Sequence, residues 1–502
     1  MGFRITTNMM MSTYRYNLMN STNKLSDSVE KVQTKRNFNS YAEDPASATQ
    51  AFRLRREFYQ TYSQTSNTKD VYNKFNTAWQ NVQGMLDDLI NPMEKISAIR
   101  GNNDTTGEAR RALAQVLRET SESMIQGFNQ QLGDHFIFAG NDGLNVPFEW
   151  KGEDLYYRGI NVNSGNVKKP TAPEPAWMTS WKGDIDNLNA YIDANPTDPN
   201  IDALIAQRDS AQSWYDYYNH EGEKPDDGLA DDHYLDALLG GDASTATGKD
   251  AEWVQYYLHE TKEPPIAEEP GWATSGDPAA DKYGVPTDMP VVGSDEVEQG
   301  WINYYRDQGN LAKLKEMCGE EMYIDLGMGA AENGPNNPVR GSYFNSALSG
   351  LDYTGFGVDE TDEFGDPKNM AILMRQLADV LDTWDENADP QGYNPDLAKN
   401  SAAGLSADEL EAKAFRLMDK LKIAQEDLTA KHVELNAQSA FLKTNQQRLE
   451  LQSTNLNSEI LDIEQVDLAD ALTALSWDQM CYNAALKIGT QLLSQSLLDY
   501  MR

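Results

Sequence analysis

Cysteine is scarce in this chain and long apolar runs are missing. The 502 residues include only Cys318 and Cys481, too few for a disulfide framework. No stretch approaches the roughly 18 consecutive apolar residues of a membrane span. The N-terminal segment MGFRITTNMMMSTYRYNL lacks the apolar core of a cleavable secretory signal. We therefore expect neither a membrane span nor ordinary signal-peptide export.

Basic residues are also few. Lys and Arg total 42 against 79 Asp and Glu, which gives a formal charge of −37. Residues 1–150 carry 16 basic and 16 acidic side chains, whereas residues 151–400 carry 17 and 48 and so account for −31 of the total. Such a surface repels phosphate backbones and anionic lipids, so we expect no nucleic-acid partner and no membrane partner.

Proline is nearly absent from the two ends. Three of the 20 prolines precede residue 151, none follows residue 400, and the remaining 17 lie between. Only long helices require so little proline. We predict a mainly α fold: a long helical coiled-coil rod that both chain termini build, with β-rich and mixed α+β outer domains inserted between them.

Residues 410–463 carry the most regular apolar repeat. A leucine recurs every seventh position and Ile463 continues the series, while the companion positions become polar in the second half. A helix with so narrow an apolar stripe should lie along other helices in a bundle or rod. The predicted rod seam consists of Leu421, Leu428, Leu435, Leu442, Leu449 and Leu456.

The last 35 residues repeat the pattern with a second apolar edge beside the first, so this helix needs two neighbours. It is either a core helix of a bundle, or a helix that packs on a partner in the same chain and on neighbouring subunits. The N-terminal stripe that begins at Tyr14 offers the partner in the same chain. The predicted assembly interface comprises Leu18, Leu25, Val32, Leu468, Leu472, Leu475, Tyr482, Leu486 and Leu493.

Two further helices are expected before the middle of the chain. Apolar residues between 71 and 89 mark a helix that Pro92 should kink or end. A second helix should run from 108 to 132. Residues 134–142, 146–163 and 322–360 alternate apolar and polar residues between turn signals, which predicts short strands.

Residues 170–319 combine acidic side chains with many aromatic ones, including Trp177, Trp181, Trp214, Trp253, Trp272 and Trp301. These tryptophans predict a folded domain rather than a disordered spacer. Aromatic surfaces can bind carbohydrate, but core packing is the commoner use of tryptophan.

Signals for catalysis or cofactors are weak. The stretch GDASTATGKD at 241–250 lacks the first glycine and the final Ser or Thr of a phosphate-binding loop. The five histidines show no zinc-binding spacing. The acidic run at Asp226, Asp227, Asp231 and Asp232 lacks the ligand order of a calcium loop, so a solvated face is favoured. We predict no catalytic residue, no cofactor, no metal and no enzymatic activity.

Both ends of the chain carry family-like motifs. These are RITTNMMMSTYRYNL at 4–18, TKRNFNSYAEDPASATQAFRLR at 34–55, NNDTTGEARRALAQVL at 102–117, DHFIFAGND followed by VPF, and the closing SQSLLDYMR at 494–502. In this order they resemble the flagellin superfamily, and within it they are most similar to the third hook-associated protein, which joins hook and filament. Thr34, Glu43 and the long segment 170–319 depart from the usual pattern.

The resemblance implies a domain division. Residues 1–40 with 465–502 would form a terminal coiled-coil core domain, and residues 41–142 with 366–464 a helical rod domain. Residues 143–169 with 320–365 would form a β-rich domain. Residues 170–319 would be an inserted, acidic, aromatic-rich outer domain.

The resemblance also implies a location and partners. Such proteins are exported through the flagellar type III apparatus with an uncleaved N-terminal signal, and they act outside the cell at the boundary of hook and filament. The implied partners are further copies of the chain in a ring, the first hook-associated protein, flagellin and a cytoplasmic export chaperone.

Two other functions stay open at this point. The chain is alternatively a large filament flagellin with a surface-displayed insertion domain. A third possibility is an enzyme or glycan-binding module displayed on either kind of subunit.

Overall fold

The computed structural model describes residues 7–101, 107–220, 222–240, 242–270, 296–329, 341–359, 364–384 and 407–500, with residues 339 and 405. The chain divides into two compact units. Unit 1 comprises residues 1–83, 321–347 and 430–502, and unit 2 comprises residues 84–320 and 348–429.

Four long helices dominate the described residues: α1 (Thr7–Thr34), α2 (Pro45–Gly101), α12 (Ala407–Glu464) and α13 (Leu468–Tyr500). The predicted mainly α fold class is therefore confirmed. Local capping explains two of the helix starts. The Asp44 carboxylate accepts hydrogen bonds from the backbone N–H groups of residues 46 and 47, and Asp467 accepts from those of residues 469 and 470.

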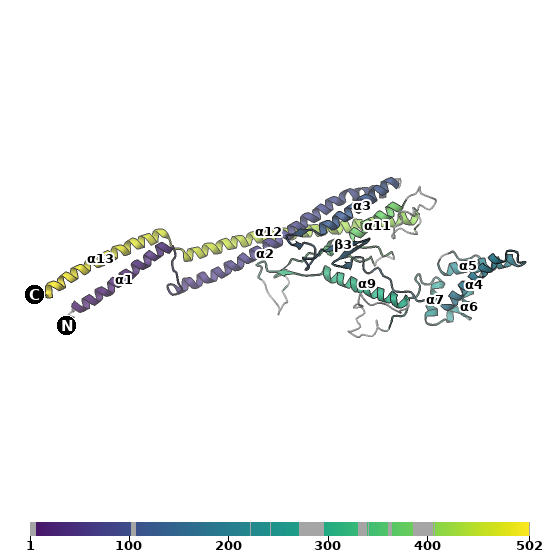
Figure 1. The fold of residues 1–502 in the computed structure, drawn as a ribbon, viewed down its shortest axis with the longest axis horizontal. Coiled ribbons are helices and arrows are strands. Elements are labelled where there is room, and N and C mark those ends of the chain that lie inside the picture. The colour runs from purple at the N-terminus through teal and green to yellow at the C-terminus, as the bar shows by residue number, and fades with distance from the viewer. Residues whose placement is uncertain are drawn as a thin grey trace. The chain divides into compact units, whose positions relative to one another are not determined.

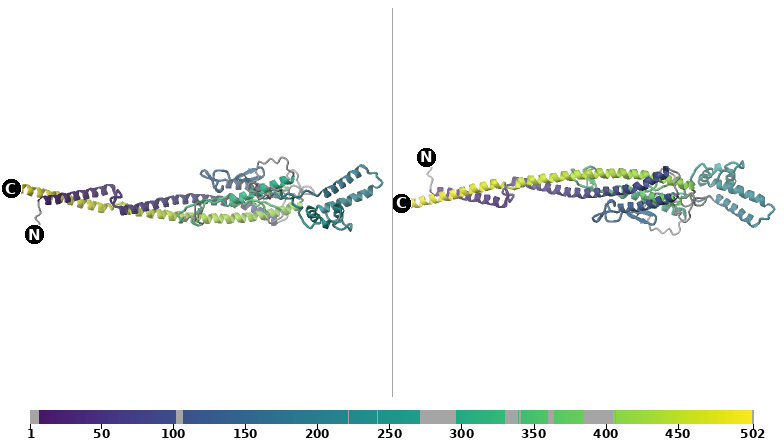
Figure 2. Two further views of the ribbon diagram at one scale, coloured as in Figure 1. Left: turned by 90° about the horizontal axis from the view of Figure 1, so that it is seen from below. Right: turned by 90° about the horizontal axis from the view of Figure 1, so that it is seen from above.

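In unit 1, α1 and α13 lie side by side and run antiparallel (Figures 1 and 2). Ser28 donates a hydrogen bond to Asp478, and Arg36 forms an isolated antiparallel bridge with Gln465. The two chain ends therefore meet in one antiparallel helical pair, although more than 400 positions separate them in sequence.

Unit 1 also contains the first part of α2 and the second part of α12, again antiparallel. Leu54 packs with Leu456 and Ile460, and Trp79 stacks on His432 with ring centroids 5.5 Å apart. A two-stranded sheet of β6 (Tyr323–Ile324) and β7 (Phe344–Asn345) belongs to the same unit.

The segment that contains β6 and β7 contacts both α2 and α12. The Phe75 ring meets the Phe344 ring edge to face at 5.3 Å. The buried Asn445 amide donates to the Leu326 carbonyl at 2.9 Å. A buried Asn in a leucine seam is satisfied in few registers, so this contact favours one alignment of α12.

Pro92 was expected to kink or to end its helix; it lies inside α2 and does not end it. The helix continues to Gly101. A proline in a helix interior costs about 3 kcal/mol. Leu89, Ile96 and Ile99 on either side of Pro92 are all at least 95% buried, and their burial offsets that cost.

Unit 2 contains the antiparallel pair of α3 (Gly107–Phe128) and α11 (Met370–Thr383). The helix predicted over 108–132 thus ends earlier, at Phe128. Arg118 forms ion pairs with Asp379 at 2.8 Å and with Asp382 at 2.5 Å. Arg110 is buried, lies over the Trp384 ring and donates to its backbone carbonyl.

Short strands follow α3 as predicted: β1 (Gln131–Leu132) with β2 (His135–Phe136), then the three-stranded antiparallel sheet of β3 (Phe148–Lys151), β4 (Asp154–Tyr157) and β5 (Ile160–Asn161). Helices α9 (Glu296–Cys318) and α10 (Gly350–Thr354) pack near this sheet. The Asp307 carboxylate on α9 accepts from the backbone N–H groups of Gly165 and Val167, which joins α9 to the segment after β5.

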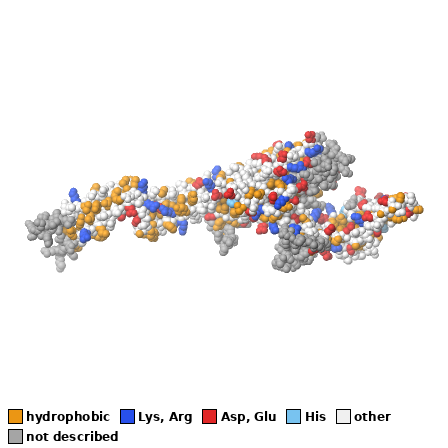
Figure 3. Space-filling model, in the orientation of Figure 1, with side chains coloured by type: hydrophobic (Ala, Val, Ile, Leu, Met, Phe, Trp, Pro, Cys, Tyr) orange, Lys and Arg blue, Asp and Glu red, His pale blue; other side chains and the backbone are white. Residues whose placement is uncertain are grey.

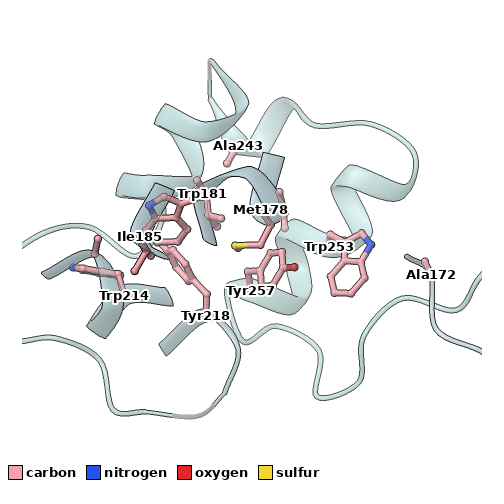
Figure 4. Close-up of a cluster of buried hydrophobic side chains, with 12 residues drawn as sticks. Ala172, Met178, Trp181, Ile185, Trp214, Tyr218, Ala243, Trp253 and Tyr257 are labelled. Atoms are coloured by element: carbon pink, nitrogen blue, oxygen red, sulfur yellow. The ribbon is translucent and has the colours of Figure 1, made fainter. Parts of the chain in front are cut away.

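A separate aromatic core lies within residues 172–257 of unit 2 (Figure 4). It is built by α4 (Ala176–Ala194), α5 (Ile201–Tyr218), α6 (His233–Leu239), the 3-10 turn η1 (Ala243–Thr245) and α7 (Lys249–Tyr257). Trp181, Trp214 and Trp253 pack here, as the sequence predicted for a folded domain. Trp301 lies in α9 outside this core, and Trp272 lies outside the described residues.

A narrow neck of backbone hydrogen bonds closes this aromatic domain. The Ala172 N–H donates to the Pro265 carbonyl at 2.6 Å, and the Ala267 N–H donates to the Pro170 carbonyl at 2.9 Å. Thr171 and Ile266 form an antiparallel bridge. The chain therefore enters and leaves the domain through two adjacent extended segments.

Candidate assembly surfaces

The contact between α1 and α13 is a narrow seam with a three-four spacing on each helix. On α1 it follows Tyr14, Leu18, Ser21, Leu25, Ser28 and Val32, all half-buried. On α13 it follows Ala471, Leu475, Asp478, Tyr482, Ala485 and Gly489, which are half-buried or buried. Gly489 allows a close approach, because a Cβ at this position would overlap the Tyr14 hydroxyl. One seam leaves most of the surface of each helix uncovered.

Large apolar side chains flank the seam on α13 and are exposed. Leu468, Leu472 and Leu486 lie on one flank, while Trp477 and Ile488 lie on the other. Trp477 is 66% exposed. On α1, Met9, Met10, Tyr16 and Met19 are exposed as well. In Figure 3, hydrophobic side chains gather on the visible face of the helical pair. Exposed apolar surface on this scale is typical of an interaction site.

The predicted interface residues fall into three groups. Leu18, Leu25, Val32, Leu475 and Tyr482 lie in the seam between the two terminal helices. Leu468, Leu472 and Leu486 lie outside it and are at least 40% exposed. The side chain of Leu493 lies outside the described residues. Their role in assembly stays a prediction. Sequence reasoning missed the polar seam residues Ser21, Ser28 and Asp478, although their three-four spacing with Tyr14 and Leu475 was a usable signal.

The six leucines of the predicted rod seam are all more than 90% buried. Leu421 and Leu428 lie in unit 2, and Leu435, Leu442, Leu449 and Leu456 lie in unit 1. Leu456 is the most exposed of the six, at 8%. They occupy the inner face of α12 within each unit, which leaves its opposite face, with Val433 and Leu451, exposed.

A charged cluster fixes α12 to a loop of unit 2. The Asp366 carboxylate accepts from Arg416 Nε at 2.6 Å and lies 3.0 Å from Lys420 Nζ. Burial opposes ionisation of Asp366, but the two cations prevail and hold the pKa of its carboxyl below the usual range. A carboxylate with two cationic partners here serves the structure rather than catalysis.

The aromatic domain contains a repeat that sequence reasoning missed. The segments WYDYYNH at 214–220 and WVQYYLH at 253–259 share the spacing Trp-x-x-Tyr-Tyr-x-His. Both histidines have positive φ, 60° at His220 and 61° at His259, and their rings stack with centroids 3.9 Å apart. Each ring donates through Nε2 to a carbonyl beside the other helix end, that of Tyr256 or that of Tyr217.

This reciprocal arrangement joins the ends of α5 and α7. The Tyr217 and Tyr256 rings extend the stack at 4.4 and 4.6 Å, so four rings form one column. Stacking covers the faces of the rings within this column, and sugars bind to the faces of aromatic rings. The stack therefore favours a structural role over carbohydrate binding. A search of the sequence for internal repeats would have found the signal.

Other chemistry is sparse in the described part of the chain. Among those residues no group of three or more His, Cys, Asp and Glu side chains is placed to hold a metal ion. A groove of about 580 Å³ in unit 2 is lined mainly by α9, α10, the loop after α10 and α12, with Leu311, Cys318, Phe356 and Ile423 on its walls. No described helix is long and apolar enough to cross a membrane.

A protein family matches the N-terminal part of the chain. Residues 5–140 match the family described as bacterial flagellin N-terminal helical region. Thus the chain begins with a flagellin-like region. The match shows that this N-terminal part of the chain is similar to the helical region of flagellins. No curated protein matches the chain.

Proposed function

We propose that the chain is a structural subunit of the bacterial flagellum that forms the junction ring between hook and filament and passes torque between them. The observation that carries this proposal is the α1–α13 pair. It is built from the flagellin-like N-terminal helix and the C-terminal helix, and exposed apolar side chains flank its seam. One seam inside the chain covers part of this surface, and neighbouring copies are the natural cover for the rest.

The long helices suit a mechanical role. Seam contacts along α2 and α12 spread a load over many residues, such as Leu54, Leu435 and Leu449, instead of concentrating it at one site. Each contact between neighbouring copies contributes little binding free energy, but the sum over all contacts in a ring is large. Torque would then pass through side-by-side helices.

The partners follow from this placement. They are further copies of the chain, the first hook-associated protein on one side, flagellin on the other, and a cytoplasmic chaperone that covers the apolar terminal helices before export. The protein would act outside the cell, at the hook-filament boundary. The opening RITTNMMMSTYRYNL and the closing SQSLLDYMR support the junction over a filament subunit.

The domain division belongs to the same proposal. We keep the boundaries expected from the sequence for the terminal core and the rod. For the β-rich domain we favour residues 143–169 with 348–365, because β6 and β7 belong to unit 1 and β3, β4 and β5 to unit 2. For the outer domain we favour the narrower limits 172–265, because the neck closes there and α9 joins the segment after β5 through Asp307. Deletion of residues 173–264 with a short Gly-Ser bridge should leave export and filament assembly intact.

A gene deletion tests the proposed function against its alternative, a large filament flagellin. Cells that lack a junction protein keep their hooks, carry no filaments and shed intact flagellin into the medium. Loss of a major flagellin instead removes the main filament protein, so the filament shortens or disappears without shed flagellin. The folded outer domain is the feature that favours the alternative, since filament flagellins display insertions at their surface.

A further inference from the structure

The exposed face of α2 near its start is aromatic and basic. Phe52 and Tyr59 are seven residues apart on one face of the helix and are 74% and 68% exposed. Arg56 projects between them from the same face and is exposed. Ala51, Leu54 and Thr61 on the opposite side are buried within unit 1. Phe52, Arg56 and Tyr59 constitute the basic face.

The exposed face of α12 at the same end of the pair is aliphatic and acidic. Leu451 and Asp462 are eleven residues apart, which places them on one side of the helix, and both are exposed. Leu449, Leu456 and Ile460 point the other way and are buried. Leu451 and Asp462, with the neighbouring Glu459, constitute the acidic face.

The two faces are complementary in charge. Residues 45–62 carry three arginines and one glutamate, whereas residues 450–464 carry four acidic side chains and no basic one. Within one chain the same complementarity is already used once, where Arg55 pairs with Glu464 across the α2–α12 contact. Among the described residues, neither Arg56 nor Asp462 has an ion-pair partner.

The two faces also point away from each other. Each helix of the pair buries its inner side, with Leu54 against Leu456 and Ile460, so the basic face and the acidic face lie on opposite sides of unit 1. They cannot meet within one chain. A contact between two unlike faces on opposite sides repeats from copy to copy and builds a ring or a filament, whereas a closed two-fold dimer needs a self-complementary face.

We propose that the basic face of α2 in one copy docks laterally on the acidic face of α12 in the next copy. This deepens the proposed function, on which it rests, by naming the lateral contact between rod segments. The exposed aromatic rings of Phe52 and Tyr59 would supply the apolar area that docking buries, and the pairing of Arg56 with Asp462 and Glu459 would set the orientation.

Photocrosslinking in assembled flagella is the first test. A photoreactive amino acid replaces Phe52 in the full chain, and crosslinked peptides are identified by mass spectrometry. We expect a dimer-sized product that links position 52 to a peptide within residues 446–464. A link from α2 to α2, or to another protein, would overturn the lateral contact while the chain's place in the flagellum stood. Absence of the chain from flagella would refute the proposed function itself.

Charge reversal provides the second test in a strain that lacks the chromosomal copy. Arg56→Glu alone and Asp462→Arg alone should each abolish stable incorporation of the full chain into flagella. The double variant Arg56→Glu/Asp462→Arg should restore it, because every lateral contact then joins the two reversed charges. Lys443→Glu reverses an exposed charge elsewhere on α12 and is the control. Normal incorporation of both single variants, or no rescue in the double variant, would overturn the proposal.

Discussion

Replacing Leu486 by Asp separates an assembly surface from an ordinary core. Leu486 lies on the flank of α13 outside the α1 seam and is 40% exposed, so the free subunit has little burial to lose there. Full burial of a leucine is worth about 1.5–3 kcal/mol, so the buried part of Leu486 in the free subunit limits the effect on the free energy of unfolding to about 1–2 kcal/mol. In the assembled flagellum a neighbouring copy should cover this flank. The carboxylate that the Leu486→Asp substitution introduces would then be buried without an ion-pair partner.

Leu435→Asp is the matched comparison in α12. Leu435 is 1% exposed within unit 1. Removal of a buried leucine costs about 2–5 kcal/mol, and an unpaired buried charge adds to that loss. We expect this variant to lower the thermal unfolding temperature of the purified subunit by many degrees, whereas Leu486→Asp leaves the main transition nearly unchanged.

Two assays decide between the interpretations. Circular dichroism at 222 nm follows thermal unfolding of each purified variant, and electron microscopy counts filaments on cells that export it. Leu486→Asp should be exported normally and fail to hold a filament. Thr473→Asp, a charge placed on the exposed side of α13 opposite the seam, should leave both export and filament attachment unchanged. If Leu486→Asp destabilised the free subunit as much as Leu435→Asp, the assignment of α13 to assembly would be wrong.

Three other predictions follow from named contacts. Gly489→Ala should push the Tyr14 ring out of the terminal seam and weaken the α1–α13 pair by about 1 kcal/mol, seen as faster hydrogen exchange in both helices, and removal of the Tyr14 side chain should reverse the effect. His220→Ala and His259→Ala should each destabilise the aromatic domain by about 1–2 kcal/mol, and together by less than the sum, because one stack is lost in both; full additivity in a double-mutant cycle would contradict the reciprocal geometry. Because cations lower the pKa of Asp366, the stability it provides is present above pH 4 and is lost as pH falls further; urea unfolding of Asp366→Asn should lack that acid-dependent part.

The large-scale architecture could be predicted because it depends on the distribution of proline and on the spacing of apolar residues, which are read directly from the sequence. Proline-poor ends and a seven-residue leucine repeat favour long helices, and the leucines of that repeat from Leu421 to Leu456 are buried. Pro92 does not end the helix, since the cost of one proline is local while the burial of Leu89 and Ile96 extends across it.

The details of the surfaces were beyond sequence reasoning. The stripe on α13 has apolar residues at several phases, so periodicity alone cannot show that Ala471 and Gly489 face α1 while Leu472 and Leu486 do not. That choice depends on the close approach at Tyr14 and the hydrogen bond from Ser28 to Asp478, which are tertiary contacts. The basic face of α2 was missed for a related reason, since Phe52 and Tyr59 look like core residues until the buried side of the helix is known.

Immunogold labelling of isolated flagella tests the central claim most directly. Antibody raised against the aromatic domain, residues 172–265, is applied to intact flagella with their hooks attached and viewed by electron microscopy. The proposed function predicts label confined to the boundary between hook and filament. Label along the whole filament would contradict the junction assignment in favour of a filament flagellin, and absence of label from every part of the flagellum would contradict a structural role there.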